Sequence, residues 1–257
     1  MTADRPDDLA GRLGTAPLDV IGQYASASNV TLLCHIGPIP EDLADAHDPS
    51  VFAPRDLAVY KPQAGEAPLW DFPTATLYRR EVAAYELDRL LGWGFVPVTV
   101  VREDGPMGRG AVQRYVPHDP NRHYFWMLEQ DDDALTAQLQ RMVVFDILID
   151  NADRKGGHVL LEDDRVRLVD HGVSFHVERK LRTVAWHFAG MPVPEEARRE
   201  ASELSTRLRA RAEDTERLRR LLSEREYQRL VERVEEVVEL ERFPDPTGPR
   251  PYPWPLL

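Results

Sequence analysis

One segment, residues 145–158, constrains this chain more than any other (FDILIDNADRKGGH). An apolar run over 142–149, interrupted only by Asp146, predicts a buried helix that ends in a polar loop. Asp153 lies in that loop, and Asp170 follows His158 by twelve residues. Carboxylate and imidazole side chains therefore come after a helix that is fixed in place by its packing in the core.

The residues after this loop predict an antiparallel hairpin. Two short β-prone runs, 159–161 and 166–169, are separated by a polar four-residue turn, 162–165. Pairing across that turn brings His158, where the first strand starts, next to Asp170, where the second ends. We therefore expect these two side chains to form a metal-binding pair.

Asp153 enters the same end of the hairpin from the preceding loop. A carboxylate that accepts a hydroxyl proton beside ligands for a divalent metal is the minimum equipment of a phosphotransferase site. Lys155, near this carboxylate, could steady a transferring phosphate or could be an ordinary solvated loop lysine. Asp146 is expected to be structural, holding Arg154 or the loop backbone, because a buried carboxylate needs a partner.

The chain uses arginine almost throughout and has lysine only at Lys61, Lys155 and Lys180. Lys61 ends a predicted strand, 57–60, and the next helix, 78–91, carries Glu81 near its start. Taken alone, Lys61 fits a surface lysine at a strand end. Followed by a helix glutamate, it fits the ion pair that holds the α- and β-phosphates in kinases.

The loop 21–29 joins small and polar residues, among them Ser26 and Ser28. It could cover phosphates with its backbone N–H groups, and it is equally consistent with an ordinary turn. Further strands are expected at 95–101 and 110–116, joined by a turn-rich connector, 102–109.

Composition limits the partners that we expect. The 257 residues include 44 Asp and Glu against 32 Lys and Arg, which argues against nonspecific binding to nucleic acid or anionic lipid. No apolar run reaches transmembrane length, and the single cysteine, Cys34, cannot form an internal disulfide. We therefore expect a cytoplasmic protein with Cys34 in a core strand. The sequence does not indicate an oligomeric state.

The order of these motifs resembles that of the phosphatidylinositol 3- and 4-kinase superfamily, and most closely the type II phosphatidylinositol 4-kinases. Residues 59–62 (VYKP) look like the strand with the ATP-binding lysine, and 113–116 (QRYV) occupy the place of the adenine-binding hinge. Residues 151–154 (NADR) look like the catalytic loop, and 169–172 (VDHG) look like the metal-binding segment. The resemblance covers roughly residues 20 to 190.

This resemblance implies an α+β, bilobal protein-kinase-like fold that uses ATP with Mg²⁺ or Mn²⁺. It implies three groups of site residues: Asp153, Arg154 and Lys155 for catalysis; Lys61, Glu81, Ser26, Ser28, Gln113 and Tyr115 for ATP; and His158 and Asp170 for the metal. The acceptor would be a hydroxyl group of a lipid headgroup, of a protein or of the kinase itself.

One departure from the family pattern opens alternatives. His158 stands where these kinases usually have asparagine, and imidazole suits Mn²⁺ better than Mg²⁺. A nucleotide-binding pseudokinase that serves as a regulatory module is the first alternative. An adenylyl transferase on the same fold is the second.

The expected layout has four parts: a flexible N-terminus over 1–19, an N-lobe over 20–117, a C-lobe over 118–240 and a proline-rich extended tail over 241–257. Helices are expected over 195–211 and 214–240. Trp254 in the tail could anchor it to a groove. The charged run 178–182 could receive an anionic group, or it could simply be solvated.

Overall fold

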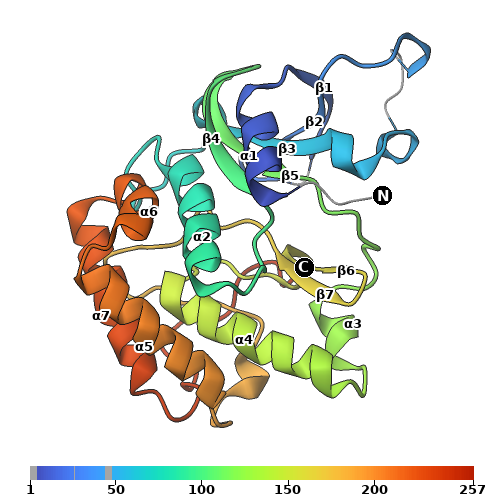
Figure 1. Ribbon diagram of the computed structural model, residues 1–257. Helices are drawn as coiled ribbons and strands as arrows, with labels where there is room; N and C mark the ends of the chain where they lie inside the picture. The colour runs from blue at the N-terminus through green and yellow to red at the C-terminus, as the bar shows by residue number, and fades with distance from the viewer. Residues whose placement is uncertain (1–4, 26, 44–47) are drawn as a thin grey trace. The chain divides into compact units, whose positions relative to one another are not determined.

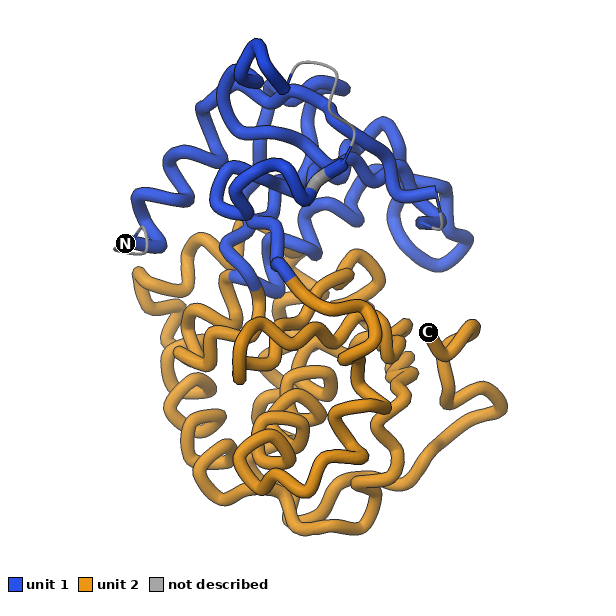
Figure 2. Tube along the Cα trace, turned by 90° about the vertical axis from the view of Figure 1, so that its right-hand side faces the viewer, with its two compact units in different colours: residues 1–85, 97–117 blue, residues 86–96, 118–257 orange. Residues whose placement is uncertain are grey.

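The computed structural model describes residues 5–25, 27–43 and 48–257, and the chain divides into two compact units (Figure 2). Unit 1 extends to Tyr85 and also takes Pro97–Pro117. Unit 2 takes Glu86–Val96 and His118–Leu257. Residues 86–96, which were expected in the N-lobe (20–117), therefore belong to the second unit.

Unit 1 is built on an antiparallel five-stranded sheet with the order β1-β2-β3-β5-β4 (Figure 1). Its strands are β1 Leu18–Gln23, β2 Leu32–Ile36, β3 Leu57–Pro62, β4 Thr99–Gly105 and β5 Gly108–Arg114. Every residue of β2 is buried, including Cys34, which lies in the core as predicted. Burial raises the pKa of this thiol to about 12, so it stays protonated.

Helix α1, Pro6–Thr15, packs against β4 and corrects the expectation of a flexible N-terminus over 1–19. Leu9 and Leu13, four residues apart, lie on one face and join a buried cluster with Cys34 and Tyr60. Arg102 of β4 donates hydrogen bonds to the carbonyl groups of Leu13 and Ala16, at the end of the helix. The leucine pair therefore indicates a packed helix despite the charged residues around it.

The connector between strands β4 and β5 is shorter than predicted. Residues 102–109, expected to form a connector, mostly continue the two strands, and residues 95–98 lie outside the sheet. Gly105 leaves room for the Tyr60 ring, because a Cβ there would lie 2.6 Å from Tyr60 Cζ. The Tyr60 hydroxyl donates to the Gly108 carbonyl over 2.6 Å. Gly105 therefore allows close packing inside the sheet, although in sequence it resembles a turn residue.

Helix α2, Leu77–Leu91, begins in unit 1 and ends in unit 2. The N–H of Gly92, which has a φ of +73°, donates to the Asp88 carbonyl over 2.8 Å and ends the helix. The Asp88 carboxylate accepts the N–H of Val96 over 3.0 Å. Asp88 therefore holds the turn that follows the helix.

Unit 2 is mainly helical (Figure 1). Its elements are α3 Tyr124–Leu128, α4 Asp133–Ile149, the hairpin β6 Val159–Glu162 and β7 Arg165–Leu168, α5 Glu195–Arg209, α6 Glu216–Leu221 and α7 Glu224–Val238. The Asp132 side chain accepts two backbone N–H groups at the start of α4, and Asp150 ends the helix with a φ of 52°. All residues from 142 to 149 are buried, which confirms the predicted buried helix.

The predicted second C-terminal helix, 214–240, is interrupted. Residues 216–221 form α6, and α7 starts anew after Ser223. Ser223 and Glu226 form a capping box, in which each side chain accepts a hydrogen bond from the other residue's backbone N–H. This Ser-x-x-Glu pattern marked a helix start that the apolar stripe alone did not reveal.

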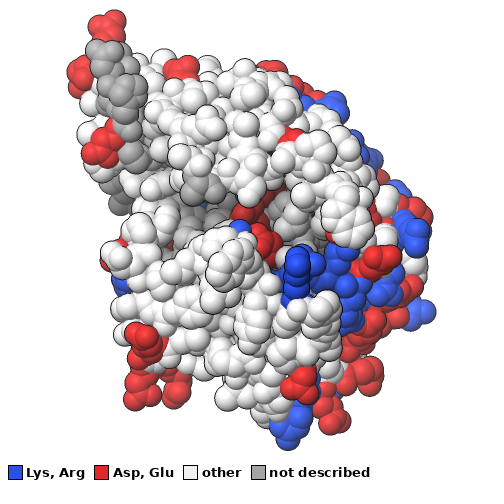
Figure 3. All heavy atoms as spheres, turned by 180° about the vertical axis from the view of Figure 1, so that it is seen from behind, with Lys and Arg blue, Asp and Glu red and all other residues white. Residues whose placement is uncertain are grey.

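Acidic and basic side chains are interleaved over these C-terminal helices (Figure 3). Ion pairs join Arg209 to Glu235 over 2.9 Å, and Arg211 to Glu224. Opposite charges on this face therefore largely compensate one another. Within the described parts of the chain, no helix is both long enough and apolar enough to cross a membrane.

Candidate functional site

The loop after α4 rests on a fully buried ion pair. The Arg154 guanidinium donates from Nε and Nη2 to the Asp146 carboxylate over 3.0 to 3.1 Å, and neither side chain is more than 1% exposed. Its Nη1 donates to the Val169 carbonyl over 2.8 Å. Asp146 thus has the structural role that we predicted. Arg154 was expected among the catalytic residues. Because its side chain is buried, it supports the loop from inside the protein and cannot contact a substrate.

Asn151 shapes the loop from inside. Its side-chain amide donates to Asp146 Oδ1 over 3.3 Å, while its Oδ1 accepts the backbone N–H of Asp153 over 2.9 Å. The N–H of Arg154 also donates to the Arg182 carbonyl over 3.0 Å. Hydrogen bonds on both sides therefore fix the backbone at Asp153.

The Asp153 carboxylate is partly exposed, and Lys155 Nζ lies 2.8 Å from its Oδ2. Burial raises the pKa of Asp153 above its ordinary value, the neighbouring Asp170 adds to this rise, and Lys155 opposes it. A carboxylate with a raised pKa and access to solvent suits general-base chemistry. Lys155 is therefore bound to the candidate base and is not a freely solvated lysine.

The hairpin β6–β7 brings His158 and Asp170 together as predicted. His158 Nε2 lies 3.3 Å from Asp170 Oδ2. The pairing continues beyond the strands, because the Val169 N–H donates to the His158 carbonyl over 3.1 Å. The same Val169 accepts a hydrogen bond from Arg154, so the buried ion pair also supports the backbone before Asp170.

One imidazole and one carboxylate fit a divalent metal as an incomplete ligand set. Among the residues with described positions, no group of three or more His, Cys, Asp or Glu side chains is arranged to hold a metal. Mg²⁺ and Mn²⁺ in nucleotide sites commonly take one or two protein ligands and complete their shell with water and phosphate oxygens. His158 and Asp170 fit such a shared site better than a permanent structural one.

In unit 1, Lys61 and Glu81 form the expected ion pair. Lys61 Nζ at the end of β3 lies 2.5 Å from Glu81 Oε1 on α2. The Glu81 side chain is only 4% exposed, whereas that of Lys61 is 21% exposed. The glutamate is therefore held in the protein while the ammonium remains accessible to solvent.

The remaining expected ATP contacts have different outcomes. The Gln113 side chain is buried and donates to Thr99 Oγ1 over 2.8 Å, and its backbone pairs with strands on both sides. The Gln113 side chain therefore points into the sheet, and contact of this segment with adenine stays a prediction. Tyr115 follows β5 and packs against a buried cluster of unit 1. Ser28 is exposed, and Ser26 lies outside the described residues.

Two further residues were missed by sequence reasoning. Tyr24, in the loop after β1, interacts electrostatically with Tyr115 and Lys61, and partial desolvation raises the pKa of its hydroxyl to about 12. Arg182 is exposed and close enough to Asp153 to lower its pKa. Tyr24 belongs to the loop that was proposed to cover phosphates, and Arg182 to the charged run, but nothing in the sequence distinguishes either from its neighbours.

The backbone of the charged run 178–182 is held in place, while the side chains of Glu178, Arg179 and Arg182 are exposed. The Lys180 N–H donates to the Asp150 carboxylate over 2.9 Å. Arg233 of α7 donates from Nε to the Leu148 carbonyl over 3.0 Å and from Nη1 to the His176 carbonyl over 2.9 Å. The C-terminal helix therefore holds both the end of α4 and the segment after Asp170.

His171 is fully buried and meets the Phe145 ring edge to face, with ring centroids 6.0 Å apart. His171 therefore lies in the core against α4, although it directly follows Asp170.

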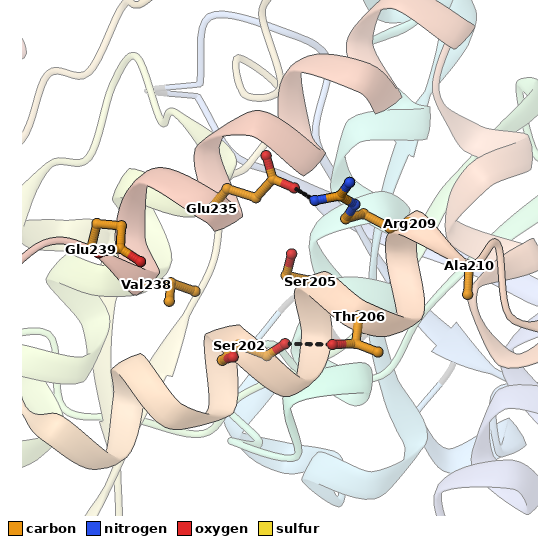
Figure 4. A pocket seen from close by; sticks show the side chains of 8 residues that line it. All are labelled: Ser202, Ser205, Thr206, Arg209, Ala210, Glu235, Val238 and Glu239. Carbon is orange, nitrogen blue, oxygen red and sulfur yellow. Dashed lines mark hydrogen bonds and ion pairs between the residues drawn. The ribbon is translucent and has the colours of Figure 1, made fainter.

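A pocket lies elsewhere in unit 2, between α5 and α7 (Figure 4). Its volume is about 600 Å³, and its lining includes Ser202, Thr206, Arg209 and Glu235. Arg209 and Glu235 pair across it, and Thr206 donates to the Ser202 carbonyl. None of the candidate catalytic or metal-binding residues lines this pocket.

No family model matches the chain. A curated relative, "Protein Rv2133c" of Mycobacterium tuberculosis, is 37% identical over 284 aligned positions, which cover 98% of this chain and 96% of that protein. Its name does not indicate an activity.

Solved structures show the fold. The Golgi casein kinase, crystallised with Mn and ADP bound, gives a TM-score of 0.55 at 14% identity over 91% of this chain and 74% of its own. The Helicobacter pylori proinflammatory kinase CtkA gives 0.52 at 10% identity over 89% of this chain and 94% of its own. The chain has a protein-kinase-like fold with a β-rich and a mainly helical unit, which confirms the predicted fold class.

Proposed function

We propose, from the premise that this chain belongs to the same family as Mycobacterium tuberculosis Protein Rv2133c, that it is an ATP-dependent phosphotransferase. It would transfer the γ-phosphate of ATP to a hydroxyl group. One observation carries the proposal: His158 and Asp170 lie 3.3 Å apart next to the loop that bears Asp153, on a kinase-like fold.

The residues of unit 2 would divide the work. His158 and Asp170 would hold Mg²⁺ or Mn²⁺, which when bound neutralises phosphate charge. Asp153 would orient the acceptor hydroxyl and accept its proton, in keeping with the raised pKa of this carboxylate. Lys155 would stabilise negative charge on the transferring group, because its ammonium already lies at Asp153.

In unit 1, Lys61 would hold the α- and β-phosphates, with Glu81 fixing the position of the ammonium. Tyr24 lies close enough to Tyr115 and Lys61 to interact with both electrostatically. We infer from the sequence motifs that the chain transfers phosphate in the manner of the phosphatidylinositol 3- and 4-kinases. The acceptor, however, need not be a lipid.

Transfer of label from ATP tests the proposal. The purified chain is incubated with γ-labelled ATP and Mg²⁺ or Mn²⁺, with lipid vesicles and a generic protein acceptor present. Asp153→Asn should lower labelling about 10²- to 10⁴-fold, because it removes the proton acceptor. Asp164→Asn, the same change at an exposed position in the hairpin turn, should leave labelling unchanged.

Other outcomes distinguish the alternatives. Label that appears only from α-labelled ATP identifies an adenylyl transferase. No label from either ATP, together with stabilisation of the chain by ATP against thermal unfolding, identifies a nucleotide-binding pseudokinase. If ATP neither labels an acceptor nor stabilises the chain, this result contradicts every nucleotide-dependent function.

A further inference from the structure

The proline-rich tail docks onto unit 2 through its backbone. The Pro251 carbonyl accepts hydrogen bonds from Trp186 Nε1 over 2.8 Å and from the Thr183 N–H over 3.2 Å. The Leu256 carbonyl accepts the N–H of Gly156 over 2.7 Å. As predicted, the tail contains neither helix nor strand beyond residue 243.

These contacts fall on the two segments that flank the candidate base. Gly156 directly follows Lys155, whose ammonium lies 2.8 Å from the Asp153 carboxylate. Thr183 pairs with Arg154 through an isolated backbone bridge. The tail therefore lies across the catalytic loop and the segment that follows the metal ligand Asp170.

The contacted surface, which we call the tail groove, consists of Gly156, Thr183 and Trp186, with Phe125 beside them. A Cβ at Gly156 would lie 2.9 Å from Leu257 Cδ2 and 2.9 Å from Phe125 Cε2, so only glycine allows this approach. Three hydrogen-bond donors of the groove are directed to main-chain carbonyls of the tail. The groove is therefore suited to bind a peptide backbone.

Side-chain exposure in the tail supports this view. Pro253 is buried, whereas Trp254 is 87% exposed and Tyr252 is 50% exposed. The expectation that Trp254 anchors the tail is wrong, because prolines and carbonyls face the protein instead. Recognition of an extended proline-containing segment by an aromatic residue that donates a hydrogen bond is a common mode of peptide binding.

We propose that the tail groove is the docking site for a polypeptide acceptor, and that residues 251–257 occupy it in cis and compete with that acceptor. This inference rests on the proposed phosphotransferase function. Two tail carbonyls five residues apart, at most about 17 Å in an extended chain, satisfy donors on separate segments, and an extended peptide backbone supplies carbonyls at such intervals.

Tethering makes the competition effective. A segment on a short linker has an effective concentration of about 1 mM, so a tail that binds the groove with an intrinsic Kd of about 100 µM would weaken the binding of a competing peptide about tenfold. The tail would therefore lower kcat/KM by the same factor for every acceptor that needs the groove.

A binding experiment on the full-length chain tests the docking claim without requiring catalysis. A fluorescent peptide with the sequence of residues 249–257 is titrated against wild type, Pro253→Asp and Pro249→Asp. Pro253→Asp places a carboxylate at a buried position, whereas Pro249→Asp makes the same change at an exposed one. Pro253→Asp should bind the peptide about tenfold more tightly than the other two chains.

Hydrogen exchange supplies the second measurement. The amides of Gly156 and Thr183 should exchange faster in Pro253→Asp than in wild type, and Pro249→Asp should match wild type. Adding Trp186→Phe to Pro253→Asp removes the Nε1 donor and should abolish the gain in peptide affinity. Equal peptide binding by all chains, or a gain that persists without Trp186, would overturn the groove as a peptide site.

Labelling from γ-labelled ATP tests the acceptor claim. Pro253→Asp should raise kcat/KM for a protein acceptor by about tenfold, while Pro249→Asp leaves it unchanged. Label found in lipid alone, or equal transfer to protein by both variants, overturns the competition. If no chain labels any acceptor, the phosphotransferase proposal fails and the acceptor claim fails with it, while the binding and exchange results still decide whether the groove binds peptide.

Discussion

Two ion pairs, one in each unit, hold candidate functional residues in different ways. Asp146 and Arg154 in unit 2 are buried completely, and Arg154 also reaches the carbonyl before Asp170. In unit 1, Lys61 Nζ lies 2.5 Å from Glu81 Oε1, and the lysine side chain is 21% exposed. The first pair fixes the backbone before Asp170. The second leaves the Lys61 side chain partly exposed to solvent.

The choice of cation follows from this difference. The planar guanidinium of Arg154 can bind a carboxylate and a carbonyl at the same time, which suits a site where geometry is permanent. The ammonium of Lys61 is compact and can turn from Glu81 toward another anion. In a chain with only three lysines, lysine at this position is therefore informative.

The largest effect is expected from breaking the buried pair. Arg154→Met should lower the free energy of unfolding by about 3–5 kcal/mol, because Asp146 would remain buried without its guanidinium partner. Unfolding in urea, followed by circular dichroism, measures this loss. The double variant Asp146→Leu with Arg154→Met should recover most of the stability, since both charges are then absent. A single variant as stable as wild type would contradict the comparison.

Asp88 extends the comparison to a buried carboxylate that backbone N–H groups hold. Burial raises its pKa to about 7, above the ordinary 3.8. Because the pKa is higher in the folded protein, this group's contribution to stability is complete below about pH 4 and is lost as pH rises through 7.

Asp88→Asn removes this titration. The stability of wild type relative to Asp88→Asn should fall by up to about 1.4 kcal/mol per pH unit between pH 4 and 7 and then level off. Urea unfolding of both chains across this range checks the slope. A constant difference would show that Asp88 titrates normally in the folded chain.

The smallest effect on stability is expected at the exposed end of the second pair. Lys61→Arg keeps the positive charge beside Glu81 and should change the free energy of unfolding by less than about 1 kcal/mol. ATP binding should nevertheless weaken by about tenfold, because a guanidinium places its charge differently from an ammonium. Thermal unfolding with and without ATP measures both quantities. Unchanged stabilisation by ATP would argue against a phosphate-binding role for Lys61.

The parts predicted from sequence depend on short-range geometry. A hairpin with a polar turn fixes which residues meet at its open end, so His158 and Asp170 could be paired in advance. A buried carboxylate must find a partner, which led from Asp146 to Arg154. Lys61 and Glu81 required the family pattern as well, because a strand and a helix can meet in several ways.

The parts that sequence reasoning missed depend on long-range packing. Helix α1 exists because two leucines fit beside Tyr60 and Cys34, and its polar composition hid this. The carbonyls of Pro251 and Leu256 carry no sequence signal, so the docking of the tail could not be anticipated. Gln113 resembled a hinge residue but completes the interior of a sheet through Thr99.

The contacts of Arg233 can form only late in the synthesis of unit 2. Its guanidinium holds the Leu148 and His176 carbonyls, which precede it by 85 and 57 residues. At roughly 5 to 20 residues per second, the ribosome would add Arg233 about 4 to 17 s after Leu148. During that interval the nascent chain carries the segment around Asp153 without the support of α7. A chaperone or the ribosome surface would then have its greatest opportunity to engage the apolar helix α4.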